Sequence, residues 1–114
     1  MEKIVIPVIH GDGIGPEVIG SAQRVVETLC KKYNIEVVWI PLTVGQQSID
    51  LGFEALPQGT VDIIRTHKVA LKGPTGTPSG KGHRSVNVDL RQELDLYANV
   101  RPVKYFPKIG RAHV

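Results

Sequence analysis

Hydrophobic residues in this chain alternate between short continuous runs and longer stretches in which they recur every three or four positions. The first run, KIVIPVI at residues 3–9, ends at a glycine turn, which is typical of a strand buried on both faces. The next stretch, residues 16–33, opens with a proline suited to the first turn of a helix. Its apolar positions form one stripe of an amphipathic helix: Val18, Ala22, Val25, Val26, Leu29 and Tyr33. The pattern therefore predicts a strand, a tight turn and a helix.

The same alternation continues in the middle of the chain. Residues 35–43 (IEVVWIPLT) have the pattern of a second strand, residues 57–67 that of a helix opened by proline, and residues 68–73 (KVALKG) that of a third strand. Strands that alternate with helices favour a mostly parallel sheet with helices on its faces. We therefore expect an α/β fold.

A glycine-rich loop, residues 72–83, leads into the last predicted elements. Ser85 is a good N-cap for a helix over residues 86–97. The apolar stripe of that helix would be Val86, Leu90, Leu94 and Tyr97. The run NVRPVKYF, residues 99–106, is strand-like, and its proline favours a sheet edge or the start of a strand.

Composition and charge narrow the class of protein. The 114 residues are 41% hydrophobic and 22% charged, which suits one domain with a real core. The net charge is +3, but only 5% of residues are aromatic, so a nucleic-acid partner is not expected. No apolar run is long enough to span a membrane, and the single cysteine, Cys30, fits a reducing compartment. We expect a cytoplasmic protein.

Residues 10–16 (HGDGIGP) look like a glycine-rich nucleotide loop but differ from one. The dinucleotide fingerprint Gly-x-Gly-x-x-Gly is met at Gly11 and Gly13, whereas Pro16 stands where the third glycine is required. Asp12, between the two glycines, is expected to bond its own backbone, as Asx residues in turns commonly do. A different kind of loop is predicted.

A candidate anion site lies around the start of the helix that Ser85 opens. Its first backbone N–H groups can bind an anion, and Asn87 and Arg91 lie one turn apart on the same side. Arg101 follows ten residues later, and each guanidinium offers a planar fork suited to a carboxylate. The pattern predicts a pocket for a small polycarboxylate. The alternative is that Ser85 only caps the helix and that Arg91 pairs with Asp95.

Three segments resemble the isocitrate/isopropylmalate dehydrogenase family of β-decarboxylating dehydrogenases, in particular the N-terminal part of its isocitrate dehydrogenases. They are GDGIGPEV, LKGPTGTPSGKGHRSVNVDLRQELDLY and NVRPVKYF, and the likeness covers residues 3 to about 106. The resemblance implies part of the family's large domain, with a mostly parallel sheet, flanking helices and no Rossmann fold. It also implies that GDGIGPEV lies near the nicotinamide.

The resemblance assigns roles to individual residues. Four of them would hold the carboxylates of the substrate: Ser85, Asn87, Arg91 and Arg101. Lys72 matches a lysine of the substrate site, Thr77 a threonine that touches both substrate and nicotinamide, and Ile14 a residue beside the cofactor. Catalytic acid-base residues and metal ligands would lie later in the family's chains, so none is expected here.

The polar segment RSVNV favours isocitrate as the substrate, because 3-isopropylmalate dehydrogenases carry a more apolar segment there. Homoisocitrate stays an alternative, since one methylene discriminates by only about 1 to 3 kcal/mol. The implied reaction is oxidation of isocitrate by NADP or NAD and loss of carbon dioxide to give 2-oxoglutarate, with Mg or Mn polarising the C2 oxygen. The family implies a homodimer.

The family's chains are about three times this long, so the resemblance implies an N-terminal fragment that is inactive alone. A non-catalytic module that binds polycarboxylates is the alternative. The last residues, IGRAHV at 109–114, back-translate as ATC GGA AGA GCA CAC GTC, which matches a common sequencing adapter. We therefore expect residues 1–108 to form part of the family's domain and residues 109–114 to be a non-native tail.

Overall fold

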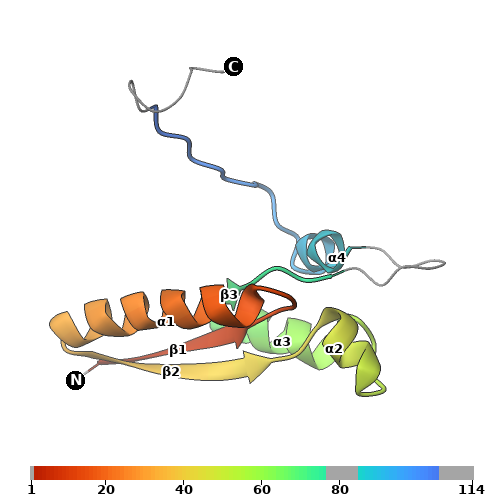
Figure 1. Ribbon diagram of the computed structural model, residues 1–114, viewed down its shortest axis with the longest axis horizontal. Helices are drawn as coiled ribbons and strands as arrows, with labels where there is room; N and C mark the ends of the chain where they lie inside the picture. The colour runs from red at the N-terminus through yellow and green to blue at the C-terminus, as the bar shows by residue number, and fades with distance from the viewer. Residues whose placement is uncertain (1, 77–84, 106–114) are drawn as a thin grey trace.

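The computed structural model describes residues 2–76 and 85–105 (Figure 1). In chain order the elements are β1 (Glu2–Ile9), α1 (Gly15–Lys32), β2 (Ile35–Leu42), α2 (Gly45–Asp50), α3 (Gln58–His67), β3 (Leu71–Lys72) and α4 (Val86–Glu93). The first strand, the long helix and the second strand thus lie where the hydrophobic pattern predicts them. No helix in the described part of the chain is both long and apolar enough to cross a bilayer.

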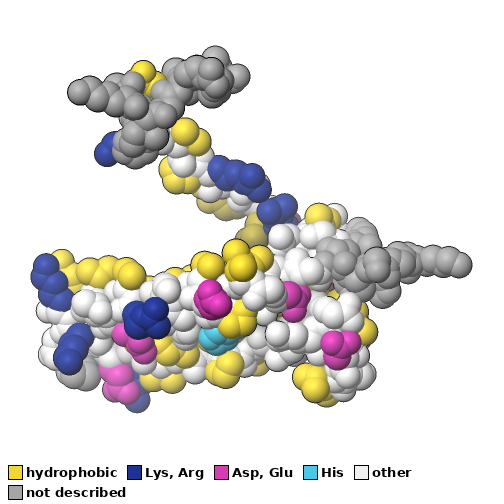
Figure 2. Space-filling model, viewed as in Figure 1, with side chains coloured by type: hydrophobic (Ala, Val, Ile, Leu, Met, Phe, Trp, Pro, Cys, Tyr) yellow, Lys and Arg dark blue, Asp and Glu magenta, His cyan; other side chains and the backbone are white. Residues whose placement is uncertain are grey.

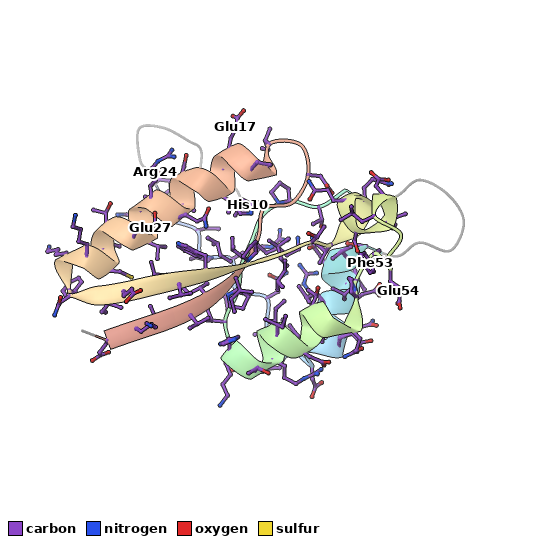
Figure 3. The ribbon with its side chains drawn as sticks, turned by 90° about the horizontal axis from the view of Figure 1, so that it is seen from below. His10, Glu17, Arg24, Glu27, Phe53 and Glu54 are labelled. Atoms are coloured by element: carbon purple, nitrogen blue, oxygen red, sulfur yellow. The ribbon has the colours of Figure 1, made fainter. Side chains whose placement is uncertain are left out.

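The sheet is parallel, with the strand order β2-β1-β3. The strands β1 and β2 pair along their whole length, from Glu2 opposite Ile35 to Ile9 opposite Leu42. In contrast, β3 pairs with β1 only at its end, beside Val8 and Ile9. The helix α1 covers one face of the sheet and α3 the other (Figures 1 and 3). The predicted α/β fold with a parallel sheet and flanking helices is confirmed.

The core lies at the carboxyl end of β1. Four buried side chains from different parts of the chain meet there: Ile9, Val44, Ile64 and Val86. The partly buried residues around them include Leu90 and Leu94, so three positions of the predicted stripe of α4 face the core. Burial of these side chains holds α4 against β1 and α3, because removing apolar surface from water is the main stabilising term.

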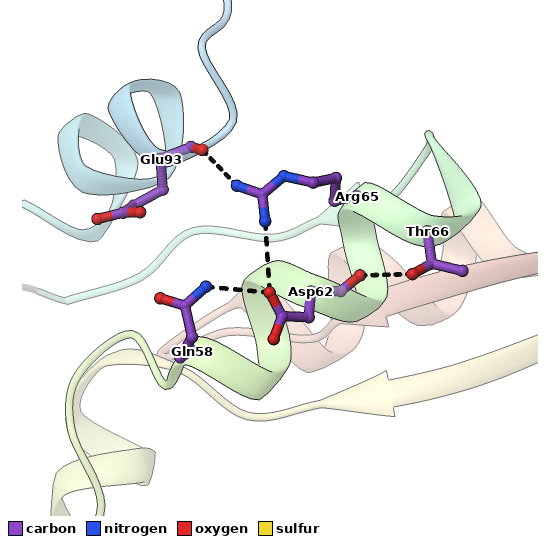
Figure 4. A network of polar contacts seen from close by, with 5 residues as sticks. All are labelled: Gln58, Asp62, Arg65, Thr66 and Glu93. Atoms are coloured by element: carbon purple, nitrogen blue, oxygen red, sulfur yellow. Dashed lines mark hydrogen bonds and ion pairs between the residues drawn. The ribbon is translucent and has the colours of Figure 1, made fainter.

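A polar contact also fixes the carboxyl end of α4 (Figure 4). The guanidinium of Arg65, on α3, donates to the Glu93 carbonyl oxygen at 2.6 Å and to Asp62 at 3.3 Å. The last carbonyl groups of a helix have no partner within the helix, so a cation that bonds one of them stabilises the helix end. Val86 in the core and the bond from Arg65 to Glu93 thus hold the two ends of α4. The positions of the side chains on its first turns are fixed as a result.

The polar side of α1 faces solvent, as its pattern predicts (Figure 3). The buried side of α1 differs in part from the predicted stripe, however. Ile19, outside that stripe, is 3% exposed, and Ala22 and Val26 are partly buried, whereas Val18, Val25 and Leu29 are each about half exposed. The buried side of α1 therefore runs through Ile19, Ala22 and Val26.

Two elements around α3 differ from the sequence prediction. The third strand is limited to residues 71–72, because Lys68 adopts the left-handed conformation, φ +64°, as the C-cap of α3. Its N–H donates to the Ile64 carbonyl oxygen at 2.7 Å and ends the helix. The short helix α2 was not predicted, because its six residues are too few to show an amphipathic period.

The predicted helix over residues 86–97 and the predicted strand over residues 99–106 are both corrected. The helix α4 ends at Glu93, since Asp95 takes a left-handed φ of +55° and Tyr97 beyond it is fully exposed. Residues 99–105 form no strand, because no neighbouring strand pairs with them in the described part of the chain. Basic and apolar side chains alternate along this extended, exposed segment (Figure 2).

Candidate functional site

The loops that follow the three strands converge at the carboxyl edge of the sheet. The turn after β1 contacts the loop after β3, because the Asp12 N–H donates to the Pro74 carbonyl oxygen at 2.8 Å. The loop after β2 joins them at Gly45, where an added Cβ would lie 3.4 Å from the Asp12 carboxylate and 3.3 Å from the Gly76 carbonyl oxygen. This edge is where open α/β sheets bind their ligands.

Asp12 bonds a distant loop, which corrects the expectation that it bonds its own backbone. Its carboxylate accepts the Gly76 N–H at 2.7 Å across 64 positions of the sequence. A hydrogen bond to an ionised carboxylate is roughly twice as strong as one between neutral groups. The glycine turn of residues 11–13 thus holds the loop after β3.

Lys72, at the end of β3, points into the same loop. Its ammonium donates to the Gly73 carbonyl oxygen at 2.9 Å and to Thr75 Oγ1 at 3.1 Å. Burial lowers the pKa of Lys72, the nearby Asp12 carboxylate raises it, and Arg91 lowers it, so that the net pKa lies below the ordinary lysine value. The charge of Arg91, on α4, is thus near enough to act on the pKa of Lys72.

The start of α4 has the predicted cap. Ser85 Oγ accepts the Asn87 N–H at 3.2 Å, which is the N-cap geometry. Arg91 lies one turn after Asn87, and no ion pair joins Arg91 to Asp95 in the described part of the chain. The alternative in which Asp95 neutralises Arg91 is therefore wrong. The structure brings Lys72, Ser85, Asn87 and Arg91 into one region.

The other predicted site residues lie apart from this region or outside the description. Arg101 lies in the exposed segment of residues 95–105, and the structure does not bring it to Arg91. Ile14 is the N-cap of α1 and is 68% exposed, so its apolar side chain is open to a ligand. Thr77 lies outside the described residues.

Comparison with protein families identifies the family of this chain. Residues 5–114 match the family described as isocitrate/isopropylmalate dehydrogenase. The chain belongs to this family. The predicted resemblance is thereby confirmed.

Individual members of the family are similar over most of this chain. The NADP isocitrate dehydrogenase of Haloferax volcanii is 50% identical over 98 residues, which are 86% of this chain and 23% of the relative. That of Archaeoglobus fulgidus is 48% identical over 101 residues, 89% of this chain and 24% of the relative. The chain thus spans about a quarter of the length of the curated relatives it matches.

Solved structures of the family share the fold. The isocitrate dehydrogenase of Methylococcus capsulatus superposes with a TM-score of 0.70 at 41% identity, over 85% of this chain and 27% of that one. A β-decarboxylating dehydrogenase of Thermococcus kodakarensis gives a TM-score of 0.68 at 34% identity, over 85% and 28%. The fold class predicted from the sequence is the one that these enzymes have.

Sequence reasoning missed two long-range contacts at this edge of the sheet. Gln47, on α2, donates to the Gly11 carbonyl oxygen at 3.2 Å and so supports the glycine turn. Neither this contact nor the bond from Gly76 to Asp12 has a local signal, since the partners are far apart in the sequence. His10, at the end of β1, contacts Gln23 on α1 at 3.1 Å, which gives it a structural partner.

A metal ion requires ligands beyond those that the described residues offer. Within residues 2–76 and 85–105 no three His, Cys, Asp or Glu side chains come together as a potential metal site. Asp12 has cationic Lys72 nearby, and its carboxylate is engaged by Gly76. These side chains do not fit a Mg or Mn site on their own, and we derive no chemical step through a metal.

The charges around Lys72 predict how its pKa responds to substitution. Arg91→Ala removes a positive neighbour and should raise the pKa of Lys72, whereas Asp12→Asn removes a negative one and should lower it further. Arg24→Ala, which deletes an exposed arginine on α1, is the matched control and should leave it unchanged. Titration of the Lys72 Cε signal by NMR checks all three. A pKa that moves alike in Arg91→Ala and Arg24→Ala would contradict a direct effect of Arg91 on Lys72.

Proposed function

We propose that this chain is the substrate-binding N-terminal part of an NADP-dependent isocitrate dehydrogenase, which converts isocitrate to 2-oxoglutarate and carbon dioxide. The observation that carries the proposal is that Lys72, at the end of β3, lines one cavity with Leu90 of α4. The first turn of α4 is capped by Ser85, and its last turn carries Arg91. Two cations and a helix N-terminus on these neighbouring elements would suit a ligand with several carboxylates. The similarity to NADP isocitrate dehydrogenases over about nine-tenths of the chain supports this choice of substrate.

The residues of this chain bind and orient the substrate. Ser85 and Asn87 would donate to one carboxylate at the helix N-terminus, and Arg91 would hold a second through its planar guanidinium. Lys72 has three N–H donors and uses two within the described residues, so a donor is left for the substrate. Holding the substrate in one orientation lowers the barrier by converting a bimolecular step into a unimolecular one.

Arg101, Thr77 and Ile14 complete the proposed site. The exposed segment of residues 95–105 carries the apolar side chains Tyr97 and Val103, which suggests that the rest of the protein packs on it and brings Arg101 inward. Thr77 would touch both substrate and nicotinamide, and the exposed Ile14 would pack beside the cofactor. Bound NADP, or NAD as the alternative, supplies the acceptor for the hydride from C2 of isocitrate.

The proposed function also includes a bound metal ion and a dimeric enzyme. We place the ligands of a Mg or Mn ion, and the residues that exchange protons, in the part of the protein that follows this chain. The complete enzyme would be a cytoplasmic homodimer, as the family resemblance implies.

Steady-state kinetics of the complete enzyme test this function. With Mg or Mn present, isocitrate should give the highest kcat/KM for NADP reduction, above homoisocitrate and 3-isopropylmalate. Residues 1–114 alone should give no turnover, because the metal ligands and proton-transfer groups are proposed to lie in the part of the protein that follows. A complete protein that binds isocitrate without turnover would favour the polycarboxylate-binding module, and a preference for 3-isopropylmalate would overturn the choice of substrate.

A further inference from the structure

Two residues hold the loop after β3 from its two sides. Asp12 bonds the backbone at positions 74 and 76, through its own N–H at 2.8 Å and its carboxylate at 2.7 Å. Lys72 bonds the intervening positions 73 and 75, at 2.9 and 3.1 Å. Asp12 and Lys72 thus bond alternate residues of the loop, and together they hold all four residues from 73 to 76.

Two glycines allow the backbone of the turn after β1 to lie directly against the backbone of the loop after β3. A Cβ at Gly11 would lie 2.0 Å from the Pro74 carbonyl oxygen, and one at Gly73 would lie 2.3 Å from that of His10. No side chain larger than hydrogen fits at these two positions. The carboxylate of Asp12 therefore reaches Gly76 from a turn that lies directly against the loop.

The same carboxylate offsets the charge of Lys72. A buried ammonium beside a guanidinium is unfavourable, and Asp12 is the neighbour that raises the pKa of Lys72. A substrate carboxylate between Lys72 and Arg91 would offset the repulsion further. Asp12 thus favours the charged form of Lys72 while it bonds the loop that Lys72 enters.

We propose that Asp12 is a positioning residue, which holds the loop of residues 73–76 and so aims the Lys72 ammonium at the anionic substrate. This inference rests on the proposed function for the identity of the substrate. The hydrogen bonds by which Asp12 holds the loop do not depend on that identity. Asp12 need not touch the substrate, because it acts through Gly76 and Lys72.

The test compares two substitutions at Asp12 with a matched control in the complete enzyme. Asp12→Ala, which removes both charge and acceptor, should lower kcat/KM for isocitrate on the order of 100-fold, mainly through a higher KM. Asp12→Asn, which keeps an oxygen acceptor, should lower it about tenfold. Glu36→Ala removes the same charge from an exposed position near the start of β2, at the opposite end of the sheet from this loop, and should leave the kinetics unchanged.

Amide hydrogen exchange at Gly76 measures the hydrogen bond from Gly76 to Asp12 independently of activity. Exchange should be fast in Asp12→Ala, intermediate in Asp12→Asn and slow in the unsubstituted enzyme and in Glu36→Ala. Unchanged exchange, or an unchanged KM for isocitrate with the loop released, would overturn the positioning role. If the unsubstituted enzyme does not turn over isocitrate, the proposed function fails, and Gly76 exchange alone decides whether Asp12 holds the loop. Asp12→Asn serves as the test if Asp12→Ala does not fold.

Discussion

Ser85→Asp is expected to lower kcat/KM for isocitrate roughly 100- to 1,000-fold in the complete enzyme, far more than Ser85→Ala does. Aspartate adds a fixed negative charge where the substrate carboxylate must bind, and like charges brought together cost several kcal/mol, about 1.4 kcal/mol for each factor of ten. The new carboxylate could itself occupy the helix N-terminus and contact Arg91. Both effects exclude the substrate.

Ser85→Ala is the matched comparison. It removes one hydrogen bond, which is worth about 0.5 to 1.5 kcal/mol, or up to about 3 kcal/mol with a charged partner. The structure adds a cost to the helix, since Ser85 Oγ caps the Asn87 N–H. Serine and aspartate are both good N-caps, so the Ser85→Asp enzyme should keep its fold by far-UV circular dichroism. Equal kcat/KM for the two variants would mean that Ser85 only caps α4.

Gly73→Ala is expected to destabilise the complete enzyme by about 2 to 3 kcal/mol and to lower its thermal midpoint by several degrees. The added Cβ would lie 2.3 Å from the His10 carbonyl oxygen and 2.8 Å from Ile19 Cγ1, so the turn after β1 and the loop after β3 must separate. Activity toward isocitrate should fall with stability, because Lys72 precedes Gly73 directly.

A second glycine of the fold provides the control for Gly73→Ala. Gly20, in the middle of α1, has no atom within 4 Å of an added Cβ. Gly20→Ala should therefore raise stability by up to about 1 kcal/mol, the difference in helix propensity between the two residues. Thermal unfolding of both variants measures the contrast. Equal midpoints would contradict the close approach of the two loops.

Local patterns were sufficient for much of this fold. The proline at position 16 and the apolar period after it predicted α1, and the apolar runs predicted β1 and β2 within a residue or two. Ser85 was predicted as a cap because capping involves only neighbouring residues. Such features depend on interactions within a few positions, which the sequence displays directly.

The extended segment after α4 shows where local patterns fail. Val103, Lys104 and Tyr105 have the alternation of a strand, but a strand forms only where a neighbour can accept its hydrogen bonds. Tyr97 continues the apolar period of α4, yet the left-handed Asp95 ends the helix first. In both cases the pattern is present in the sequence, but the backbone conformation depends on a pairing strand or on the dihedral angles of one residue.

The sequence by itself determined the class of fold, the capped start of α4 and the candidate anion-binding residues, because each depends on composition or on short spacing. Tertiary structure alone decided that Lys72 lines a cavity with α4, that Asp12 bonds Gly76 and that Arg101 lies in an exposed segment. Those relations join residues that the sheet brings together from distant parts of the chain. Their energy comes from burial and from charge at short distance, and neither exists until β1, β3 and α4 have packed.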